Sequence, residues 1–224
     1  MEETTVLVTG GTRGIGGATV RRLAGAGAHV VTCGRDRDAL DELAGEVEGV
    51  TVQRADVRDE YDVERLVETA AREGDGIDAV VANAGVYRGV PGETPLAEES
   101  YAAFDDHLRT NARGAFATIR EATPHLTDDA RAVVLSGRIA RDPGAGFGSY
   151  AVSKAATEAV ARQFAAELSV PVGVVDPGAV ATDLTGGRGT DPERAADLVH
   201  WALVEAAPDT LDGAVVDRGT IRGE

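Results

Sequence analysis

Seven short apolar segments, separated by longer amphipathic ones, limit the folds open to this chain of 224 residues more than any other feature of its sequence. The apolar segments are nearly continuous in Val, Ile, Leu and Ala and cover residues 5–9, 29–33, 50–54, 77–82, 132–136, 172–175 and 214–217. The segments between them, such as RDRDALDELAGEV and DEYDVERLVETAAREG, place apolar residues three and four positions apart, as on one face of a helix. Apolar strands that alternate with helices predict a doubly wound α/β fold, in which helices cover both faces of a seven-stranded parallel sheet.

The chain shows no low-complexity linker and no internal repeat, so we expect residues 1–224 to form a single domain. Its first residues lead directly into the segment TTVLVTG without a basic and apolar leader. No apolar run approaches the ~18 residues that a membrane-spanning helix needs. We therefore expect a soluble cytoplasmic protein.

The charge of the chain is strongly acidic. Thirty-eight Asp and Glu against 22 Lys and Arg give a formal charge of −16, which argues against nucleic acid or an anionic membrane as the main partner. The acids are spread along the chain, and this surface resembles that of proteins from salt-accumulating, halophilic microbes, in which high salt screens the repulsion. An acidic mesophilic protein from a GC-rich genome is the alternative.

The number and spacing of the cysteine and histidine residues argue against a disulfide and against a metal site. The single cysteine, Cys33, rules out an internal disulfide and is interpreted as a small buried residue. The four histidines are scattered without metal-ligand spacing, so no metal site is predicted.

The first predicted strand is followed by a glycine-rich turn, TGGTRGIGG, and then by a helical segment. Gly10, Gly14 and Gly16 would let the backbone approach a pyrophosphate while the helix N-terminus supplies N–H groups and positive potential. Close packing of a helix on a sheet is the alternative reason for small residues here.

Lys154 is the only lysine of the chain and lies four residues after Tyr150 in the segment YAVSK. Residues four apart share one face of a helix, so the two side chains are predicted to act together.

Six motifs occur in the order typical of the short-chain dehydrogenase/reductase family. They are TGGTRGIG at residues 9–16, Asp56-Val57, Asn83-Ala84-Gly85, Asn111, YAVSK at residues 150–154, and Pro177-Gly178 with Thr182. The chain resembles this family from residue 5 to about residue 182. The resemblance implies a Rossmann-type fold and an NADP(H)- or NAD(H)-dependent oxidoreductase.

In this resemblance, Tyr150 is the general acid that protonates a substrate carbonyl oxygen during hydride transfer, or the base in the reverse direction. A free tyrosine has a pKa near ~10, and Lys154 would favour its phenolate and hydrogen-bond the cofactor ribose. An arginine would not replace this lysine, because its planar fork differs from a compact ammonium. Asn111 would interrupt a helix and help to hold a water in a proton relay to Lys154.

The carbonyl-binding serine of the family is where this sequence departs from the pattern. The usual position, 13 residues before the tyrosine, is Gly137, and Ser136 lies one residue earlier. We favour Ser136 as the catalytic serine because a strand end can bulge, while Gly137 in that position would remove the hydroxyl. Ser149 is a weaker substitute because it is expected to point elsewhere.

The resemblance also assigns the residues that bind the cofactor. They are Gly10, Thr12, Arg13, Gly14, Ile15 and Gly16 at the turn, Arg35 after the second strand, Asp56 and Val57 at adenine, Asn83, Ala84 and Gly85 at the ribose, Tyr150 and Lys154, and Pro177, Gly178, Val180 and Thr182 along the nicotinamide. Arg13 and Arg35 could clamp a 2′-phosphate, so NADP(H) is favoured over NAD(H). Asp36 is the opposing feature, because an acid after the second strand pairs with ribose hydroxyls.

The chain after Thr182 is short. Relatives often insert a helical lid there, whereas DLTGGRG leads directly to a predicted helix with Thr190 or Asp191 as its cap and Pro192 near its start. The C-terminal segment lacks an Asp-Gly-Gly tail and resembles the carbonyl-reductase-like branch. A homodimer or a homotetramer is compatible with this pattern.

The sequence therefore predicts an NADPH-dependent reductase of a small ketone, aldehyde or 3-oxoacyl thioester. The alternative from another class is a non-catalytic NADP(H)-binding regulatory or sensor protein of the same fold. A sugar-nucleotide epimerase is disfavoured, because the chain has no room for its substrate domain.

Overall fold

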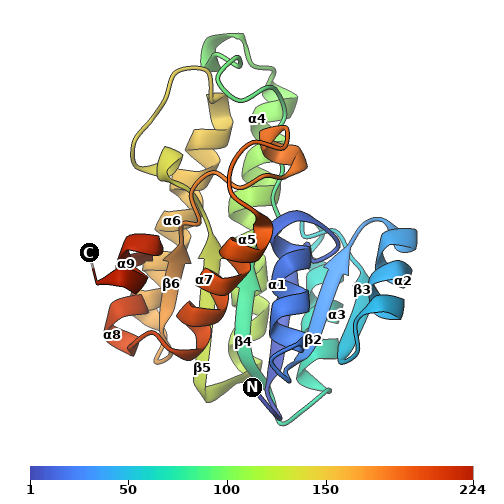
Figure 1. The fold of residues 1–224 in the computed structure, drawn as a ribbon. Coiled ribbons are helices and arrows are strands. Elements are labelled where there is room, and N and C mark those ends of the chain that lie inside the picture. The colour runs from blue at the N-terminus through green and yellow to red at the C-terminus, as the bar shows by residue number, and fades with distance from the viewer. Residues whose placement is uncertain (224) are drawn as a thin grey trace.

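The sheet of the computed structural model, which describes residues 1–223, contains seven parallel strands in the order β3-β2-β1-β4-β5-β6-β7 (Figure 1). The strands are β1 (Thr5–Thr9), β2 (His29–Gly34), β3 (Val50–Arg54), β4 (Ile77–Ala82), β5 (Leu126–Leu135), β6 (Val172–Val175) and β7 (Val215–Val216). The doubly wound, Rossmann-type fold predicted from the sequence is confirmed.

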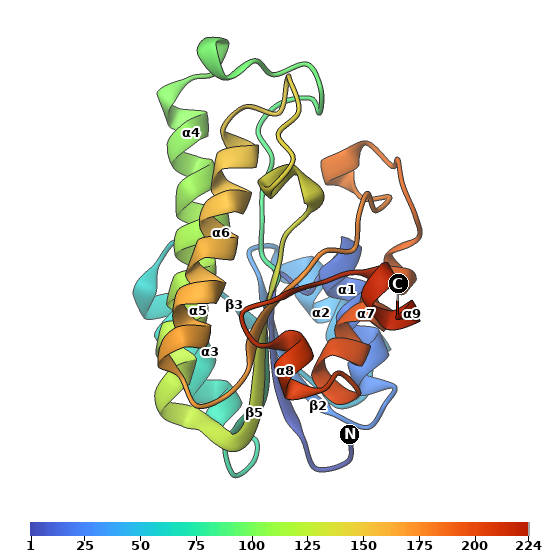
Figure 2. The same cartoon turned by 90° about the vertical axis from the view of Figure 1, so that its left-hand side faces the viewer.

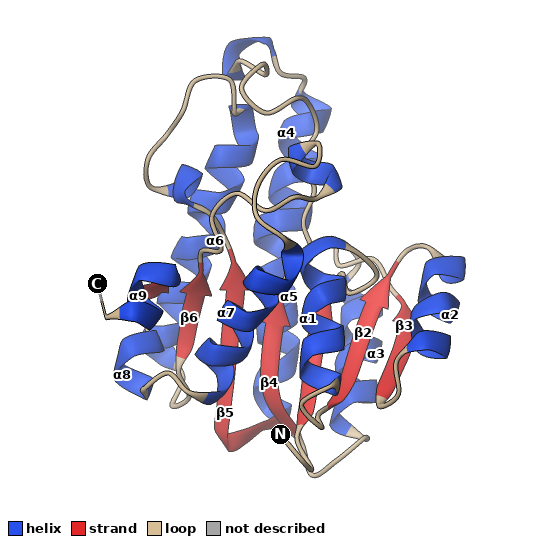
Figure 3. Cartoon of the chain, viewed as in Figure 1, coloured by secondary structure: helices blue, strands red, loops and turns tan. Residues whose placement is uncertain are grey.

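Helices cover both faces of this sheet (Figures 2 and 3). One face carries α1 (Gly14–Ala24), α2 (Arg37–Glu46) and α7 (Pro192–Val204), and the other carries α3 (Glu60–Ala71), α5 (Gly114–Ala122) and α6 (Gly148–Glu167). The helix α4 (Tyr101–His107) packs on α6 and extends beyond the ends of the strands (Figure 2). The short helices α8 (Pro208–Leu211) and α9 (Arg218–Arg222) lie next to β7.

The core is divided between the two faces, because successive strand residues point to opposite sides. Val6 and Val8 pack against α1 and α7, whereas Leu7 between them packs on the side of α3, α5 and α6. Cys33 is 1% exposed on that second side, and burial raises the pKa of its thiol to about 11. The predicted burial of Cys33 is confirmed.

Two predicted strands have different limits in the structure. β5 begins at Leu126, six residues before the predicted start at 132, and ends at Leu135 instead of Ser136. Its first part carries the exposed acids Asp128 and Asp129, so it lacks the apolar pattern of a buried strand. β7 contains only Val215–Val216 instead of residues 214–217.

The connection between β6 and α7 is short, as the sequence predicts. Within residues 176–191 it contains one helical turn, η5 (Asp183–Thr185), and then α7 begins at Pro192 with Asp191 at its N-cap position. No helix among residues 1–223 is long and apolar enough to cross a membrane.

Candidate active site

The predicted site residues gather where the strands end at their carboxyl termini. Gly10 follows β1, Asn83 follows β4, Ser136 follows β5 and Pro177 lies two residues after β6. In a parallel sheet these ends lie along one edge, and that edge is where ligands bind in open α/β folds.

The glycine-rich turn has the geometry of a phosphate cradle. Gly10 and Gly14 adopt positive φ angles of 70° and 55°, which favour glycine. A Cβ on Gly16 would lie 2.1 Å from the Gly10 carbonyl oxygen and 2.4 Å from Nδ2 of Asn83, so no larger residue fits. Arg13 is the N-cap residue of α1, and no side chain caps this helix, which leaves the first N–H groups available to an anion.

Asn83 supports this turn from the neighbouring strand. Its Nδ2 donates to the carbonyl oxygens of Thr9 at 2.9 Å and Gly10 at 3.1 Å. The backbone N–H of Ala84 donates to the Thr9 hydroxyl at 3.2 Å. The Asn83-Ala84 motif therefore joins β4 to the turn after β1.

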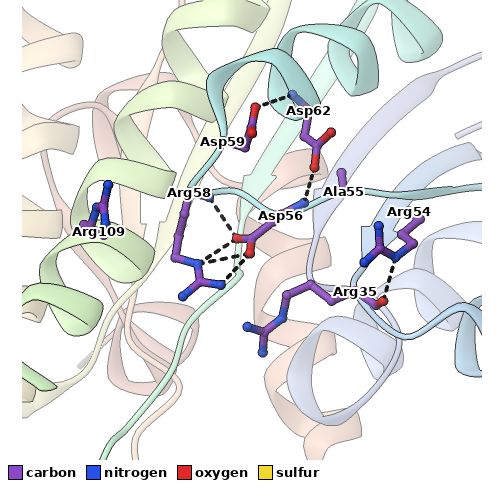
Figure 4. Close-up of a pocket in the computed structure, with 8 residues that line it drawn as sticks. All are labelled: Arg35, Arg54, Ala55, Asp56, Arg58, Asp59, Asp62 and Arg109. Atoms are coloured by element: carbon purple, nitrogen blue, oxygen red, sulfur yellow. Dashed lines mark hydrogen bonds and ion pairs between the residues drawn. The ribbon is translucent and has the colours of Figure 1, made fainter. Parts of the chain in front are cut away.

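A cavity of about 350 Å³ lies beyond the ends of β2 and β3 (Figure 4). Its lining consists of four arginines and four other residues: Arg35, Arg54, Arg58, Arg109, Ala55, Asp56, Asp59 and Asp62. The Nε of Arg58 is 3.0 Å from both carboxylate oxygens of Asp56, and hydrogen bonding by Arg58 holds the pKa of Asp56 below its usual value. The cavity thus has an excess of cations suited to an anionic ligand.

Two of the predicted cofactor residues are separated in the structure. Arg13 forms an exposed ion pair with Asp183 at 3.2 Å and does not line the cavity that contains Arg35. Asp36 accepts hydrogen bonds from the backbone N–H groups of Asp38 and Ala39 and so caps α2. Arg54, Arg58 and Arg109 were not predicted, although Arg54 could have been found as the last residue of the strand beside β2.

Tyr150 and Lys154 lie one turn apart on α6, as predicted. Lys154 Nζ is 5.8 Å from the centre of the Tyr150 ring and donates to the Leu135 carbonyl oxygen at 2.8 Å. Burial, assisted by Tyr87 and Asp176, raises the pKa of Tyr150 to about 12. Burial lowers the pKa of Lys154 to about 8, against the opposing effect of Glu158. The tyrosine therefore holds its proton at neutral pH, and the expected lowering of its pKa by Lys154 is not found, because burial of the phenol dominates.

Asn111 lies in a π-helical segment, Leu108–Arg113, between α4 and α5, so the predicted helix interruption is confirmed. Its Nδ2 donates to the Val86 carbonyl oxygen at 3.0 Å and to the Ser153 hydroxyl at 2.9 Å. A Cβ on Gly85 would lie 3.3 Å from Oδ1 of Asn111 and 3.8 Å from Nζ of Lys154. Asn111 is thus fixed close to Gly85, which also adjoins Lys154.

The two residues considered for the carbonyl-binding serine have different surroundings. The Ser136 hydroxyl donates to Oε1 of Glu158 at 2.8 Å, and Ser136 is 9% exposed. Gly137 has an extended backbone, with φ −169° and ψ 160°, and a Cβ there would meet no atom within 4 Å. Ser149 is buried, and its hydroxyl lies 2.7 Å from Nδ1 of His107.

The other predicted cofactor residues lie along the same edge. Val57 packs against the start of α5, since a Cβ on Gly114 would lie 2.8 Å from Cγ2 of Val57. Thr182 approaches the glycine-rich turn, since a Cβ on Gly14 would lie 3.2 Å from Cγ2 of Thr182. The remaining members are Thr12 and Ile15 in the turn, Pro177 and Val180, which are buried, and Gly178, whose φ is 73°.

One cluster beside Tyr150 was not predicted. Glu99 accepts a hydrogen bond from the Ser149 backbone N–H at 2.6 Å, at the first turn of α6, and its Oε1 lies 3.3 Å from Nδ1 of His107. Tyr87 contacts the Tyr150 ring edge-on, with centroids 4.8 Å apart. Glu99 lies in an irregular segment, so neither periodicity nor spacing marks it.

Known proteins match this chain in sequence and in fold. Residues 4–193 match the family model described as short chain dehydrogenase. A chloroplastic protein of Arabidopsis thaliana, NADPH-dependent aldehyde reductase 2, is 32% identical over 200 residues, which cover 80% of this chain and 72% of the plant protein.

Two solved structures are similar over almost the whole chain. One is a 3-ketoacyl-(acyl-carrier-protein) reductase from Brucella melitensis complexed with NADH, with a TM-score of 0.87, 25% identity and 97% of each chain covered. The other is a short chain dehydrogenase from Burkholderia cenocepacia J2315 in complex with NADP, with a TM-score of 0.86, 26% identity and 96% of each chain covered.

The lowered pKa of Lys154 predicts a rise of stability with pH. Between about 8, its pKa in the folded protein, and its usual 10.5, the unfolded chain binds more protons at this side chain than the folded protein does. Urea unfolding from pH 8 to 9.5 should therefore show a steeper rise of the unfolding free energy in the wild type than in Lys154→Met, by at most about 1.4 kcal/mol per pH unit. Parallel curves for the two proteins would contradict the shift.

Proposed function

The chain belongs to the short-chain dehydrogenase/reductase family, and on that basis we propose that it is an NADP(H)-dependent oxidoreductase. Its reaction interconverts a ketone, aldehyde or 3-oxoacyl thioester and the corresponding alcohol. The observation that carries the proposal is the placement of Tyr150 and Lys154 on one helix beside the edge that also holds the glycine-rich turn.

The residues present fit a dinucleotide cofactor. The turn from Gly10 to Gly16 would hold the pyrophosphate, because its backbone can be approached closely and the first turn of α1 has free N–H groups. The arginine-lined cavity would hold the adenosine end, and Pro177, Gly178, Val180 and Thr182 would line the nicotinamide. When bound, the cofactor supplies or accepts the hydride.

Tyr150 would transfer the proton. Its raised pKa keeps the phenol protonated at neutral pH, which suits an acid that gives a proton to the carbonyl oxygen as it is reduced. Lys154 supplies a nearby positive charge that favours the phenolate left behind. Asn111 would hold the backbone next to Lys154 in a fixed position through its bonds to Val86 and Ser153.

The preference for NADP(H) rests on the cavity beyond β2. Arg35 and Arg54 both line it, and Arg54 Nε donates to the Arg35 carbonyl oxygen at 3.1 Å, which brings the two residues together. Asp36, which would repel a 2′-phosphate, is engaged in the cap of α2. Guanidinium groups bind phosphate through paired hydrogen bonds, so Arg35 is proposed to recognise the 2′-phosphate.

A non-catalytic NADP(H)-binding regulatory protein is the second candidate. The observation that favours it is Gly137, which has open space where a Cβ would lie and carries no hydroxyl for a substrate carbonyl. The intact Tyr150, Lys154 and Asn111 favour the enzyme.

The enzyme proposal predicts turnover that depends on Tyr150. In molar KCl, NADPH oxidation is measured with ketones, aldehydes and 3-oxoacyl thioesters, and NADPH binding is measured by quenching of protein fluorescence. Tyr150→Phe should abolish turnover and retain NADPH binding, because only the proton donor is lost. A wild type that binds NADPH and turns over none of these compounds would favour the regulatory protein.

Arg35 should determine the choice of cofactor. Arg35→Ala is expected to raise the KM for NADPH by about tenfold to a hundredfold, since a charge-assisted bond to phosphate contributes about 1.5–3 kcal/mol, and to leave the KM for NADH nearly unchanged. Arg37→Ala is the control, because Arg37 is exposed on α2 and does not line the cavity. Equal losses with both cofactors would contradict the assignment.

Restoring a hydroxyl at position 137 should accelerate the reaction. Gly137→Ser fits the extended backbone and the open space, and a carbonyl-polarising hydroxyl contributes up to ~10²-fold in kcat. The sequence favours Ser136 as the carbonyl-binding serine, but its hydroxyl donates to Glu158 at 2.8 Å. We therefore expect Ser136→Ala to lower kcat by less than about threefold, because it loses a single hydrogen bond. If Ser136→Ala abolishes turnover and Gly137→Ser gains nothing, Ser136 is the carbonyl-binding residue.

A further inference from the structure

Two carboxylates that the proposed reaction does not use are buried next to the site. Glu158 follows Lys154 by one turn on α6, and Asp176 is the first residue after β6. Their side chains are 2% and 7% exposed. Buried carboxylates need a cation or several hydrogen bonds, because the loss of hydration destabilises the charged form.

Arg141 provides this cation to both carboxylates. It directly follows η4 (Arg138–Ala140), in the segment that joins β5 to α6, and its two terminal nitrogens contact Oε1 of Glu158 and Oδ2 of Asp176. Ser136 also donates to Glu158, and the Gly178 N–H donates to Oδ1 of Asp176 at 2.9 Å.

The two acids depend on Arg141 to different degrees. Glu158 has a second cation, since Nη1 of Arg162 is 3.8 Å from its Oε2. Asp176 has no ion-pair partner other than Arg141 among residues 1–223. The loss of Arg141 would therefore leave mainly Asp176 as an unpaired buried charge.

The charge of Asp176 acts on the proposed proton donor. After burial and Tyr87, it is a further cause of the raised pKa of Tyr150. Three groups face the Tyr150 ring. Nζ of Lys154 on α6 lies 5.8 Å from the ring centre. The ring centres of Tyr87, after β4, and His107 on α4 lie 4.8 Å and 6.0 Å from it. A second carboxylate, Glu99, approaches this cluster through His107, with its Oε1 3.3 Å from Nδ1.

We propose that Arg141 is a positioning residue of this site, which holds the buried Asp176 carboxylate in an ion pair and so limits its effect on Tyr150. The inference rests on the proposed role of Tyr150 as proton donor. Arg141 also joins the segment between β5 and α6, which contains Gly137, to α6 and to the end of β6.

Removing Arg141 and removing the charge of Asp176 should shift the ionisation of Tyr150 in opposite directions. Without Arg141, the uncompensated Asp176 anion disfavours the phenolate, so the Tyr150 ionisation moves to higher pH. Without the Asp176 charge, the ionisation moves to lower pH. Alcohol oxidation requires the phenolate as base, so its rate should rise with pH along a limb that follows these movements.

The test compares the wild type with Arg141→Met, Asp176→Asn and the double variant in the pH profile of kcat for alcohol oxidation. We expect a shift of about one pH unit upward for Arg141→Met, a downward shift for Asp176→Asn, and a near-wild-type limb for the double variant, which loses both charges. Arg138→Met is the matched control, because Arg138 pairs with the exposed Asp142 on the same segment. Shifts of the same sign in both single variants, or no shift in either, would overturn the proposal.

A second readout separates this proposal from the proposed function. Fluorotyrosine labelling brings phenol ionisation into an accessible pH range, and the ¹⁹F signal of Tyr150 is identified by its loss in Tyr150→Phe. Its titration should shift in the same directions even in a protein without turnover. If Arg141→Met does not fold, Asp176→Asn and the double variant still carry both tests. If the wild type shows turnover but the Tyr150 titration is unchanged in these variants, the role of Arg141 is overturned and the proposed function stands.

Discussion

Burial of a parallel sheet on both faces is the constraint on which this structure depends. Because α1, α2 and α7 cover one face and α3, α5 and α6 the other, the middle of the sheet is packed mainly with apolar side chains. The polar residues of the candidate site therefore lie at the ends of the strands. Because the strands are parallel, their carboxyl ends lie along a common edge, so the glycine-rich turn, Asn83, Ser136 and Pro177 come together although they are far apart in sequence.

The environment of this edge also explains why the only lysine is kept at position 154. A buried cation must fit between α6 and the end of β5, where Nζ reaches the Leu135 carbonyl oxygen. A compact ammonium with rotatable donors meets this need and can lose its proton, as its lowered pKa of about 8 indicates. The 21 arginines, which keep their charge, lie mostly in surface ion pairs or in the cavity beyond β2 and β3.

Charge near Tyr150 is balanced by neighbours from several elements. Burial lowers the pKa of Lys154 against the opposing effect of Glu158 on α6. Burial, with Tyr87 and Asp176 as smaller causes, raises the pKa of Tyr150, and Arg141 contacts both acids. At the other side of the ring, Glu99 and His107 hold the first turn of α6 through Ser149. These contacts join α6 to segments that are distant in the chain, so the position and the ionisation of the phenol depend on long-range packing.

The sequence by itself determined the sheet, its helices and the placement of the motif residues, because strand burial and helix amphipathicity are local, periodic properties. It also placed Tyr150 and Lys154 on one helix face, and Asn111 in an interrupted helix. The start of β5 at Leu126 was not predicted, because the exposed Asp128 and Asp129 interrupt the apolar pattern. Only the tertiary structure decided that Arg13 pairs with Asp183, that Asp36 serves as a helix cap and that Arg141 joins Glu158 to Asp176. The residues of these ion pairs are far apart in the chain, and they come within contact distance only when the helices pack on the sheet.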